Sequence, residues 1–463
     1  MTNGRIHFIG VGGAGMSAIA KVLLEMGTPV SGSDIKESAN IARLREQGAE
    51  IAIGHAAENV AGASTVVISS AIPETNPELV AAREKDIEVV VRAQMLGRLG
   101  DGRTMVAVAG THGKTTTTSM VALVLERCGC RPTFLIGGEL NDIGTNAQYG
   151  TGELVIAEAD ESDSSFLHLS PKVAVVTNVE ADHLDHYASF AEIEETFERF
   201  LRKLPDDGCA IVCGDSPNLV ALAKRAGVRA VTYGFDEAND IRALDVCALD
   251  GGSSFRVRQG DRVLGPVTLR IPGDHNVANA LATVAVCGVL GVGFDQVAPV
   301  LAQFSGVKRR FQRVGSERRV TVVDDYAHHP TEVRATLAAA RTGTWRRVVC
   351  VFQPHRFSRT KLLGNDFGLA FDDADVVVLT DVYGAGEEPE PGVSGKLLVD
   401  AILHRKPQAQ VAYIPKRGEI AAYLRESVRE GDLVITMGAG DVWAVGPELL
   451  DAMSPGPGCE VAE

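Results

Sequence analysis

Short apolar runs alternate with stretches of helical apolar spacing along most of the chain. The runs Ile6–Ile9, Met105–Ala109 and Leu154–Ala157 are too short for helices and end at glycines or acids, which favours buried strands. Stretches such as Met16–Met26 carry the three- and four-residue apolar spacing of helices. Strands that alternate with helices are typical of parallel sheets covered on both faces. We therefore expect an α/β protein.

The length of 463 residues predicts about three domains. We expect a Rossmann-like domain over 1–103. A P-loop ATPase-like domain with a parallel sheet is expected over 104–313, and a second Rossmann-like domain over 314–463. The Pro/Gly-rich tail from Ser454 lies outside the predicted core.

A glycine loop that ends in Lys114-Thr115 follows the predicted strand Met105–Ala109 and opens a helix that runs to about Cys128. This is the layout of a phosphate-binding loop, in which backbone N–H groups and a lysine face the anion. Val108 stands where the strict motif has glycine, so the loop is a variant. The predicted nucleotide-binding residues of the loop are Gly110, Thr111, His112, Gly113, Lys114, Thr115 and Thr116.

A second glycine loop, Gly10–Gly15, follows the predicted strand Ile6–Ile9. Asp34 ends the next strand, about 20 residues further on, as in the dinucleotide fingerprint. The diphosphate of a UDP-sugar suits this segment as well as NAD does. A simple tight turn is the third reading.

Acids and histidines cluster where two further strands end, with Glu158 after the first and His183 after the second. Ligands collect at the carboxyl ends of parallel strands. Thr115 and Glu158 are natural ligands for Mg²⁺, and His183 suits a second ion that Mn²⁺ can replace. Each carboxylate can instead cap the helix that follows it.

Three further groups carry candidate chemistry. Asn276 and Asn279 open an apolar helix, where they can cap it or contact an adenine. The basic run at 308–313 is either a solvated charge run or a hinge that presents a cation to the γ-phosphate. Arg356 and Arg359 lie one turn apart and form a fork for carboxylate or phosphate.

Composition excludes some partners. The net charge of −15 argues against broad nucleic-acid or anionic-membrane surfaces. The 8 cysteines are irregularly spaced, which favours buried thiols in a reducing cytosol. No apolar run approaches a membrane span, and the N-terminus does not resemble a signal peptide. We expect a cytoplasmic protein.

The chain resembles the Mur ligases, the ATP-dependent amino-acid ligases of peptidoglycan precursor synthesis, over essentially its full length. The stretches similar to the family's ATP site are Gly-Thr-His-Gly-Lys-Thr-Thr at 110–116, Glu-Ala-Asp-Glu-Ser-Asp at 158–163, Thr-Asn-Val-x-x-Asp-His-Leu-Asp at 177–185 and His-Asn-x-x-Asn-Ala at 275–280. The stretches similar to its alanine-adding members are Gly-Val-Gly-Gly-Ala-Gly-Met-Ser at 10–17, Asp-Asp-Tyr-Ala-His-His-Pro at 324–330, Gln-Pro-His-Arg-Phe-Ser-Arg-Thr at 353–360 and Thr-Asp-Val-Tyr at 380–383. Members that add later amino acids use a carbamylated lysine shortly after the position of His183, whereas no lysine occurs here between His183 and Arg202.

This resemblance implies ligation of L-alanine to UDP-N-acetylmuramate through an acyl phosphate. ATP and Mg²⁺, or Mn²⁺ in its place, are then the cofactors, and the protein is a monomer or a weak homodimer. Two alternatives stay open. One is a ligase that recycles murein tripeptide, and the other is an NAD-dependent oxidoreductase built on Gly10–Gly15.

The resemblance also implies a role for each matching residue. Lys114, His183, His328 and Arg356 are the implied catalytic residues, and Thr115, Glu158 and His183 hold metal. His275, Asn276 and Asn279 contact adenine, whereas Arg310 and Asp325 close on the nucleotide. The implied UDP-sugar and alanine contacts are Gly12, Gly13, Ala14, Gly15, Asp34, His55, Ser70, Tyr326, His328, Arg356 and Arg359.

Overall fold

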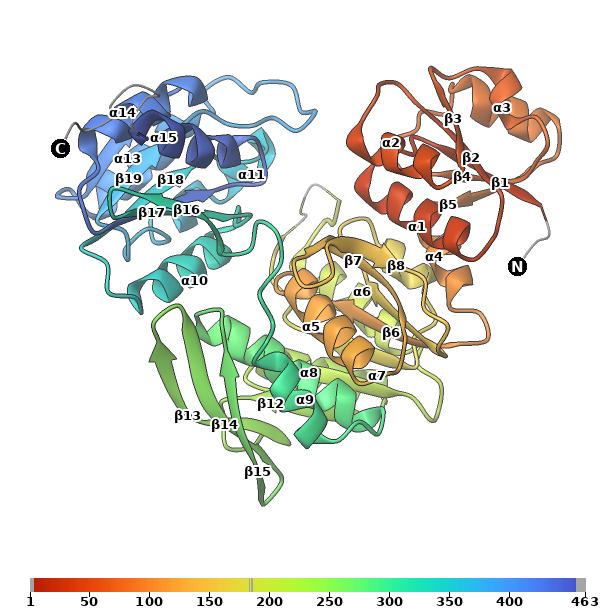
Figure 1. Cartoon of the computed structure of the whole chain (residues 1–463), viewed down its shortest axis with the longest axis horizontal. Coiled ribbons are helices and arrows are strands. Elements are labelled where there is room, and N and C mark those ends of the chain that lie inside the picture. Colours follow the sequence, from red (N-terminus) through yellow and green to blue (C-terminus); the bar gives the residue numbers. More distant parts are fainter. Residues whose placement is uncertain (1–3, 183, 185, 455–463) are drawn as a thin grey trace, which may run out of the picture. The chain divides into compact units, whose positions relative to one another are not determined.

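A computed structural model describes residues 4–182, 184 and 186–454 (Figure 1). The chain clusters into two compact units. The first runs from the N-terminus to Leu244 and adds Arg256–Val267 and Ala278–Phe304. The second consists of Asp245–Phe255, Thr268–Val277 and the chain from Ser305 onward.

The N-terminal sheet has five parallel strands in the order β3-β2-β1-β4-β5. Side chains alternate along β1, so that Phe8 packs under α1 and α2 whereas Ile9 packs under α3. The sheet has one strand fewer than the six of a full dinucleotide-binding fold. Its elements are β1 (Arg5–Ile9), α1 (Ala14–Glu25), β2 (Val30–Asp34), α2 (Ala39–Glu46), β3 (Glu50–Ile53), β4 (Ala63–Ile68), α3 (Pro77–Glu84), β5 (Glu88–Val91) and α4 (Arg92–Leu99).

The central sheet has ten strands in the order β15-β14-β13-β12-β11-β10-β6-β9-β7-β8. The strand before the phosphate loop, β6, lies between β10 and β9 and runs parallel to both. Its strands are β6 (Thr104–Ala109), β7 (Thr133–Leu140), β8 (Thr145–Gln148), β9 (Leu154–Glu158), β10 (Val173–Val176), β11 (Cys209–Cys213), β12 (Ala230–Gly234), β13 (Ile241–Leu249), β14 (Gly252–Gln259) and β15 (Arg262–Leu269). The helices are α5 (Lys114–Arg127), α6 (Phe190–Leu201), α7 (Pro217–Ala226), α8 (Asp274–Val289) and α9 (Phe294–Leu301).

The C-terminal sheet has six strands in the order β16-β17-β21-β18-β19-β20, and β16 alone is antiparallel to its neighbour. Cys350 faces the core beneath α10 and α13, whereas Val349 and Val351 face α14 and α15, so both faces are covered. The strands are β16 (Gln312–Glu317), β17 (Val320–Asp325), β18 (Arg347–Phe352), β19 (Val376–Leu379), β20 (Gln410–Tyr413) and β21 (Asp432–Met437). The helices are α10 (Pro330–Arg341), α11 (Phe357–Leu362), α12 (Gly364–Phe367), α13 (Gly395–Arg405), α14 (Ile420–Ser427) and α15 (Val445–Met453).

The α/β class with mostly parallel sheets is therefore confirmed. The hairpin of β7 and β8, which are antiparallel, has no counterpart in the sequence prediction. Neither do β13 to β15. Arg242 and Asp245 interrupt the apolar residues of β13, and the second half of this strand is exposed. None of the described helices is long and apolar enough to cross a bilayer.

Candidate active site

The phosphate loop has the predicted geometry, with β6 before it and α5 directly after Gly113. Gly110 and Gly113 both have positive φ, at 131° and 80°. A Cβ atom on Gly110 would lie 2.1 Å from Thr177 Oγ1, and one on Gly113 would lie 2.8 Å from Asn279 Oδ1. Only glycine fits either position, which leaves the backbone N–H groups of the loop open to an anion.

Lys114 bends back over its own loop. Its Nζ donates to Gly110 O at 2.6 Å and to Thr111 O at 3.1 Å, and it pairs with Glu161 Oε1 at 2.7 Å. Burial lowers the pKa of the lysine, but the attraction of Glu161 outweighs it and raises this pKa overall. Lys114 is therefore held as a cation at the loop, in reach of an anion.

Glu161 is a functional candidate that the sequence prediction missed. Its side chain is 3 % exposed and its carboxyl lies against the phosphate-loop lysine. Burial raises the pKa of Glu161 to about 7, although Lys114 opposes the shift. Glu161 is one of four acids in the run Glu158–Asp163, and their spacing in the sequence does not show which of them faces Lys114.

Thr115 and Glu158 lie together as two metal ligands require. Thr115 Oγ1 donates to Glu158 Oε1 at 3.0 Å, and Glu158 Oε2 accepts from the N–H of Gly137 at 2.7 Å. The Thr115 hydroxyl in the first turn of α5 and the Glu158 carboxylate at the end of β9 supply hard oxygens. They fit Mg²⁺, which prefers such ligands and retains several waters. His183, the third predicted ligand, lies outside the described residues.

The chain directly after β10 braces the phosphate loop through hydrogen bonds. Thr177 Oγ1 donates to His112 O at 2.6 Å, and Asn178 Oδ1 accepts from His112 N at 2.7 Å. Thr111 Oγ1 accepts from Glu180 N at 2.9 Å. These contacts hold residues that were predicted to bind nucleotide. The bracing residues lie in the stretch 177–185 that resembles the family's ATP site, but no individual role was predicted for them.

The helix after the loop is rich in threonine, and tertiary contacts explain why. Thr115 to Thr118 are all buried. Thr117 Oγ1 donates to Asn279 Oδ1 at 3.0 Å, and Thr118 Oγ1 donates to Lys114 O at 2.8 Å. Thr116 is 8 % exposed on the same turn. The Thr117 hydroxyl ties α5 to α8, whereas that of Thr118 bonds within α5. Burial and these bonds offset the poor helix propensity of threonine.

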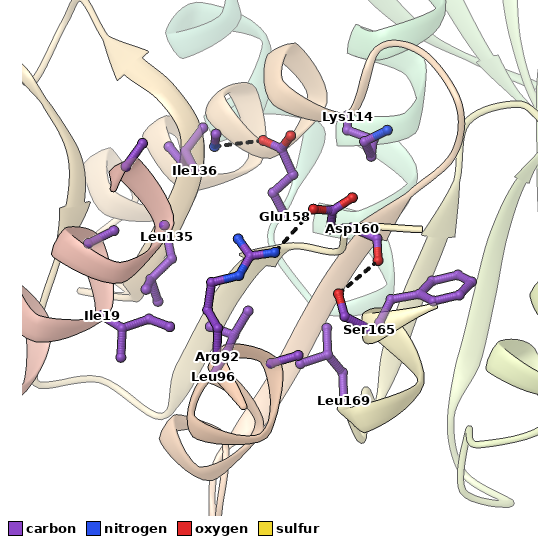
Figure 2. Close-up of a pocket in the computed structure, with 16 residues that line it drawn as sticks. Ile19, Arg92, Leu96, Lys114, Leu135, Ile136, Glu158, Asp160, Ser165 and Leu169 are labelled. Atoms are coloured by element: carbon purple, nitrogen blue, oxygen red, sulfur yellow. Dashed lines mark hydrogen bonds and ion pairs between the residues drawn. The ribbon is translucent and has the colours of Figure 1, made fainter. Parts of the chain in front are cut away.

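A cavity of about 280 Å³ joins the phosphate loop to the N-terminal glycine loop (Figure 2). Figure 2 shows Lys114, Glu158 and Asp160 on one side and Arg92 reaching toward Asp160, to which its guanidinium donates at 3.1 Å. The apolar part of the wall contains Ile19, Leu96, Leu135, Ile136, Phe166 and Leu169, and the glycine loop contributes Ala14 and Gly15. The cavity thus connects the two loops that were predicted to bind phosphates.

The N-terminal glycine loop is held by Asp34. Gly12 N donates to Asp34 Oδ2 at 2.9 Å, and a Cβ atom on Gly12 would lie 2.9 Å from the same oxygen. A Cβ atom on Gly15 would lie 2.5 Å from the guanidinium of Arg92, so a larger residue there would require Arg92 to move. Gly13 precedes α1 as its N-cap residue.

His55 follows β3 at the same edge, where its Nδ1 lies 3.0 Å from Ser33 Oγ. Ser70 is exposed in the turn after β4.

The residues that open α8 point to different partners. Asn276 Nδ2 donates to Pro272 O at 2.7 Å, four residues earlier in the chain. Asn279 accepts from Thr117, next to Gly113 of the phosphate loop. His275 is exposed on the first turn. Of these residues, Asn279 is thus the one joined to the loop within the first unit.

In the second unit, Tyr326 and His328 form one aromatic cluster with two residues that sequence reasoning did not assign. The ring centroids of Tyr326 and His328 lie 5.3 Å apart, and those of His328 and His355 lie 5.6 Å apart. The ring of His355 stacks on Tyr383 at 5.9 Å. Arg359 Nη1 lies 3.4 Å from His355 Nδ1, so the predicted arginine belongs to this cluster.

Arg356 has a positive φ of 67° and precedes α11 as its N-cap residue. Its backbone N–H donates to Tyr383 O at 2.8 Å, which ties the strained residue to the cluster.

The basic run at 308–313 is not simply solvated. Arg309 Nε donates to Asp324 Oδ2 at 2.9 Å. The guanidinium groups of Arg309 and Arg310 lie 5.0 and 5.1 Å from the ring centroid of Tyr326. The reading as a solvated charge run is therefore wrong for these two residues.

Asp325 is 6 % exposed, and its carboxylate accepts from the N–H groups of Phe311 and Ala327 at 2.7 Å each. Burial raises the pKa of Asp325 from 3.8 to about 6, although the nearby Arg310 and the two N–H groups oppose the shift. The folded protein then holds this proton more tightly than the unfolded chain. The stability contributed by the group is complete below about pH 4 and is lost as the pH rises through 6.

We predict that Asp325→Asn removes this pH-dependent component. The free energy of unfolding of the wild type, minus that of the variant, should fall by on the order of 3 kcal/mol between pH 4 and 7. Trp345 and Trp443, the only tryptophans, both lie in the second unit, so their fluorescence during urea unfolding reports on it. The exposed Asp372→Asn is the control. A difference that stays flat with pH would contradict the assigned shift.

Three family models match successive parts of the chain. They are a Mur ligase family catalytic domain over 5–104, a Mur ligase middle domain over 108–287, and a Mur ligase glutamate ligase domain over 309–440. The chain belongs to the Mur ligase family. The resemblance seen in its motifs is thereby confirmed.

Curated relatives match over nearly their whole length. A protein of Geotalea uraniireducens named UDP-N-acetylmuramate–L-alanine ligase is 50 % identical over 449 residues, which cover 97 % of this chain and 98 % of the relative. A protein of the same name from Syntrophotalea carbinolica is 51 % identical over 450 residues, covering 96 % and 97 %.

Solved structures agree with the fold of this Mur ligase. A UDP-N-acetylmuramate–alanine ligase of Thermotoga maritima has a TM-score of 0.81 at 31 % identity and covers 97 % of this chain and 99 % of its own. A murein peptide ligase of Psychrobacter arcticus has a TM-score of 0.70 at 25 % identity and covers 97 % and 98 %.

Proposed function

We propose that this Mur ligase joins L-alanine to UDP-N-acetylmuramate with ATP, giving UDP-N-acetylmuramoyl-L-alanine, ADP and phosphate. The observation that carries the proposal is the identity of about 50 %, over nearly the full length, to relatives that bear the name of this activity. The cavity between the two phosphate-binding loops supports it, because the reaction needs a sugar nucleotide and ATP at neighbouring sites.

ATP is proposed to lie on residues 110–116, with Lys114 against its β- and γ-phosphates. Such a position would exchange the Lys114 contact to Glu161 for a contact to phosphate. Asn279, His275 and Asn276 are the proposed adenine contacts, and Arg310 and Asp325 the residues that close on the nucleotide. Thr115 and Glu158 would hold Mg²⁺, which supplies positive charge to the phosphates, and His183 is proposed for a second ion.

The diphosphate of UDP-N-acetylmuramate is proposed to lie on Gly12–Gly15, with the muramoyl group in the cavity that leads to Lys114. Ala14 and Gly15 line that cavity together with Lys114 and Glu158. Asp34, His55 and Ser70 are proposed to lie near the uridine. Arg356, Arg359 and Tyr326 are proposed to frame the carboxylates of the muramoyl group and of alanine.

The proposed chemistry has two steps, because a free carboxylate resists attack by an amine. An oxygen of the muramoyl carboxylate attacks the γ-phosphorus, the bond to ADP breaks, and an acyl phosphate forms. The alanine nitrogen then attacks the acyl carbon, and the tetrahedral intermediate expels phosphate. Lys114 stabilises the charge on the transferred group, and exclusion of water protects the acyl phosphate.

His328 is the proposed base that takes the proton of the alanine ammonium or amine. Its Nδ1 lies 3.0 Å from the carbonyl oxygen of Tyr326. A carbonyl oxygen only accepts, so Nδ1 carries the hydrogen and the lone pair of the neutral ring is on Nε2. That tautomer can receive a proton at Nε2.

The domain boundaries 1–103, 104–313 and 314–463 remain part of the proposal, as do a cytoplasmic location, a monomer or weak homodimer, and the absence of nucleic-acid and membrane partners.

The murein tripeptide ligase is the alternative that a specific observation supports, because a murein peptide ligase shares the fold at 25 % identity. The identity to the alanine-adding relatives is twice as high. An NAD-dependent oxidoreductase is not favoured, since the full-length relatives are ligases.

The proposal predicts a sharp dependence on the amino acid. Phosphate release from ATP is measured with UDP-N-acetylmuramate and each amino acid in turn, and with murein tripeptide. We expect L-alanine to stimulate release more than any acidic amino acid or the tripeptide. Stronger stimulation by the tripeptide would favour the alternative, and stimulation by glutamate alone would overturn the assignment.

A further inference from the structure

A fully buried carboxylate, Glu78, lies on the first turn of α3 in the N-terminal sheet domain, with an exposed fraction of 0 %. Five groups surround its two oxygens. Ser33 Oγ lies at 2.6 Å and His7 Nε2 at 3.2 Å from Oε2; Asn59 Nδ2 lies at 2.6 Å, Ala56 N at 3.3 Å and His55 Nδ1 at 3.6 Å from Oε1. None of these contacts was assigned by sequence reasoning.

Glu78 is ionised despite its burial. Burial by itself raises the pKa of Glu78, but hydrogen bonds from His7, Ser33 and Asn59 outweigh it and lower this pKa to about 2. An ionised carboxylate can only accept hydrogen bonds. Every group around Glu78 must therefore turn a hydrogen toward it.

This requirement determines which nitrogen of His55 carries its proton. The single hydroxyl hydrogen of Ser33 goes to Glu78, so Ser33 Oγ can only accept at its contact with His55 Nδ1, 3.0 Å away. Nδ1 is thus the donor, and in the neutral ring the lone pair is on Nε2. His7 follows the same logic, because its Nε2 donates to Glu78 and, in the neutral ring, its Nδ1 then accepts from Ser31 Oγ at 3.0 Å.

The network lies at the ligand edge of the sheet. The backbone carbonyl of Ser33 accepts from the N–H groups of Gly10 and Val11, which begin the glycine loop, at 2.8 and 3.0 Å. The same serine therefore anchors the glycine loop through its backbone and His55 through its hydroxyl. The side chain of His55 keeps 18 % of its surface exposed, whereas His7 and Glu78 are sealed off.

We propose that Glu78 is a positioning residue that holds His55 with its proton on Nδ1, so that Nε2 accepts a hydrogen bond from the bound uridine nucleotide. The donor is either the uracil N3–H or a ribose hydroxyl. If it is the base, the site discriminates against cytosine, whose N3 has no hydrogen. This inference rests on the proposed function only in taking a uridine nucleotide as the ligand.

The first test measures binding of UDP, 3-methyl-UDP, 2′-deoxy-UDP and 3′-deoxy-UDP by calorimetry at pH 8, where an ordinary imidazole is neutral. The wild type should bind the analogue that lacks the relevant donor about tenfold more weakly than UDP. His55→Ala should bind UDP about tenfold more weakly than the wild type and lose that discrimination. If both proteins discriminate equally among the four nucleotides, His55 is not the acceptor.

The second test uses Glu78→Gln, with Glu84→Gln at the exposed end of the same helix as control. We expect the KM for UDP-N-acetylmuramate to rise about tenfold, with kcat and the KM for ATP within twofold of wild type. If Glu78 has a purely structural role, the variant should have a lower melting temperature but an unchanged KM for UDP-N-acetylmuramate in assays well below that temperature. That result would overturn the inference.

His55→Ala gives a second route if Glu78→Gln does not fold, because His55 lies at the surface edge of the network. Failure of the proposed function is distinguishable from failure of this inference. The nucleotide-binding arms need neither alanine nor ATP, whereas the function fails if the wild type shows no alanine-dependent release of phosphate.

Discussion

Replacing Lys114 by alanine is expected to lower turnover by about a hundredfold or more, the usual effect of removing one donor to a transition state. The reason lies in its position, since Nζ sits over the phosphate loop within 2.6–3.1 Å of Gly110 O, Thr111 O and Glu161. No other lysine occurs in residues 104–171, so no neighbour in the loop can replace it. Alanine-dependent phosphate release under saturating substrates measures the effect.

The matched control is Lys172→Ala, because Lys172 is exposed and pairs with Asp207 at 2.7 Å. Its turnover should stay within twofold of wild type. Lys114→Ala also leaves Glu161 buried without its cation, so circular dichroism and binding of UDP-N-acetylmuramate must show that the variant is folded. A folded Lys114→Ala variant with turnover within tenfold of wild type would disprove the role of the loop.

Glu158→Gln is expected to lower turnover by at least about a hundredfold at millimolar Mg²⁺, because a bound metal contributes several kcal/mol of charge stabilisation. Glutamine can still accept the hydrogen bond from Gly137 N, so the loop geometry should survive. What is lost is the negative charge beside Thr115 Oγ1.

A readout independent of turnover is the binding of Mn²⁺ in the presence of ATP, followed by electron paramagnetic resonance. We expect weaker binding in Glu158→Gln and wild-type binding in Glu153→Gln, an exposed acid just before the same strand. Equal Mn²⁺ affinity in wild type and Glu158→Gln would remove Glu158 from the metal site.

Glu161 is an anionic partner of Lys114 in the phosphate loop. Its carboxylate holds Lys114 from 47 residues away in sequence. Without this pairing, the buried cation would lack compensation. The lysine therefore reaches a phosphate only by exchanging one anion for another.

Local sequence was a good guide wherever a feature is made by neighbouring residues. The phosphate loop, the glycine loop and the strands before them were predicted at nearly their observed positions, because a strand, a tight turn and a helix start are each specified within a few residues. The pairing of Thr115 with Glu158 was also expected, since both follow neighbouring parallel strands.

Features made across long sequence separations were not visible in the same way. Thr177 and Asn178 brace His112 from 65 and 66 residues away, and Glu78 reaches Ser33 across 45. Arg92 was not singled out in the sequence, yet its guanidinium lies against Gly15 and Asp160. Nothing in the residue types near Arg92 or Glu78 distinguishes them from surface charges.

The sequence by itself determined the α/β class, the two glycine loops and the family, because these depend on short-range backbone requirements and motif spacing. The tertiary structure alone decided which of several similar acids faces Lys114, which carboxylate is buried beneath the N-terminal sheet, and which nitrogen of His55 carries its proton. The physical reason is that burial and hydrogen-bond partners decide the charge and tautomer of a side chain, and both are properties of its neighbours in space.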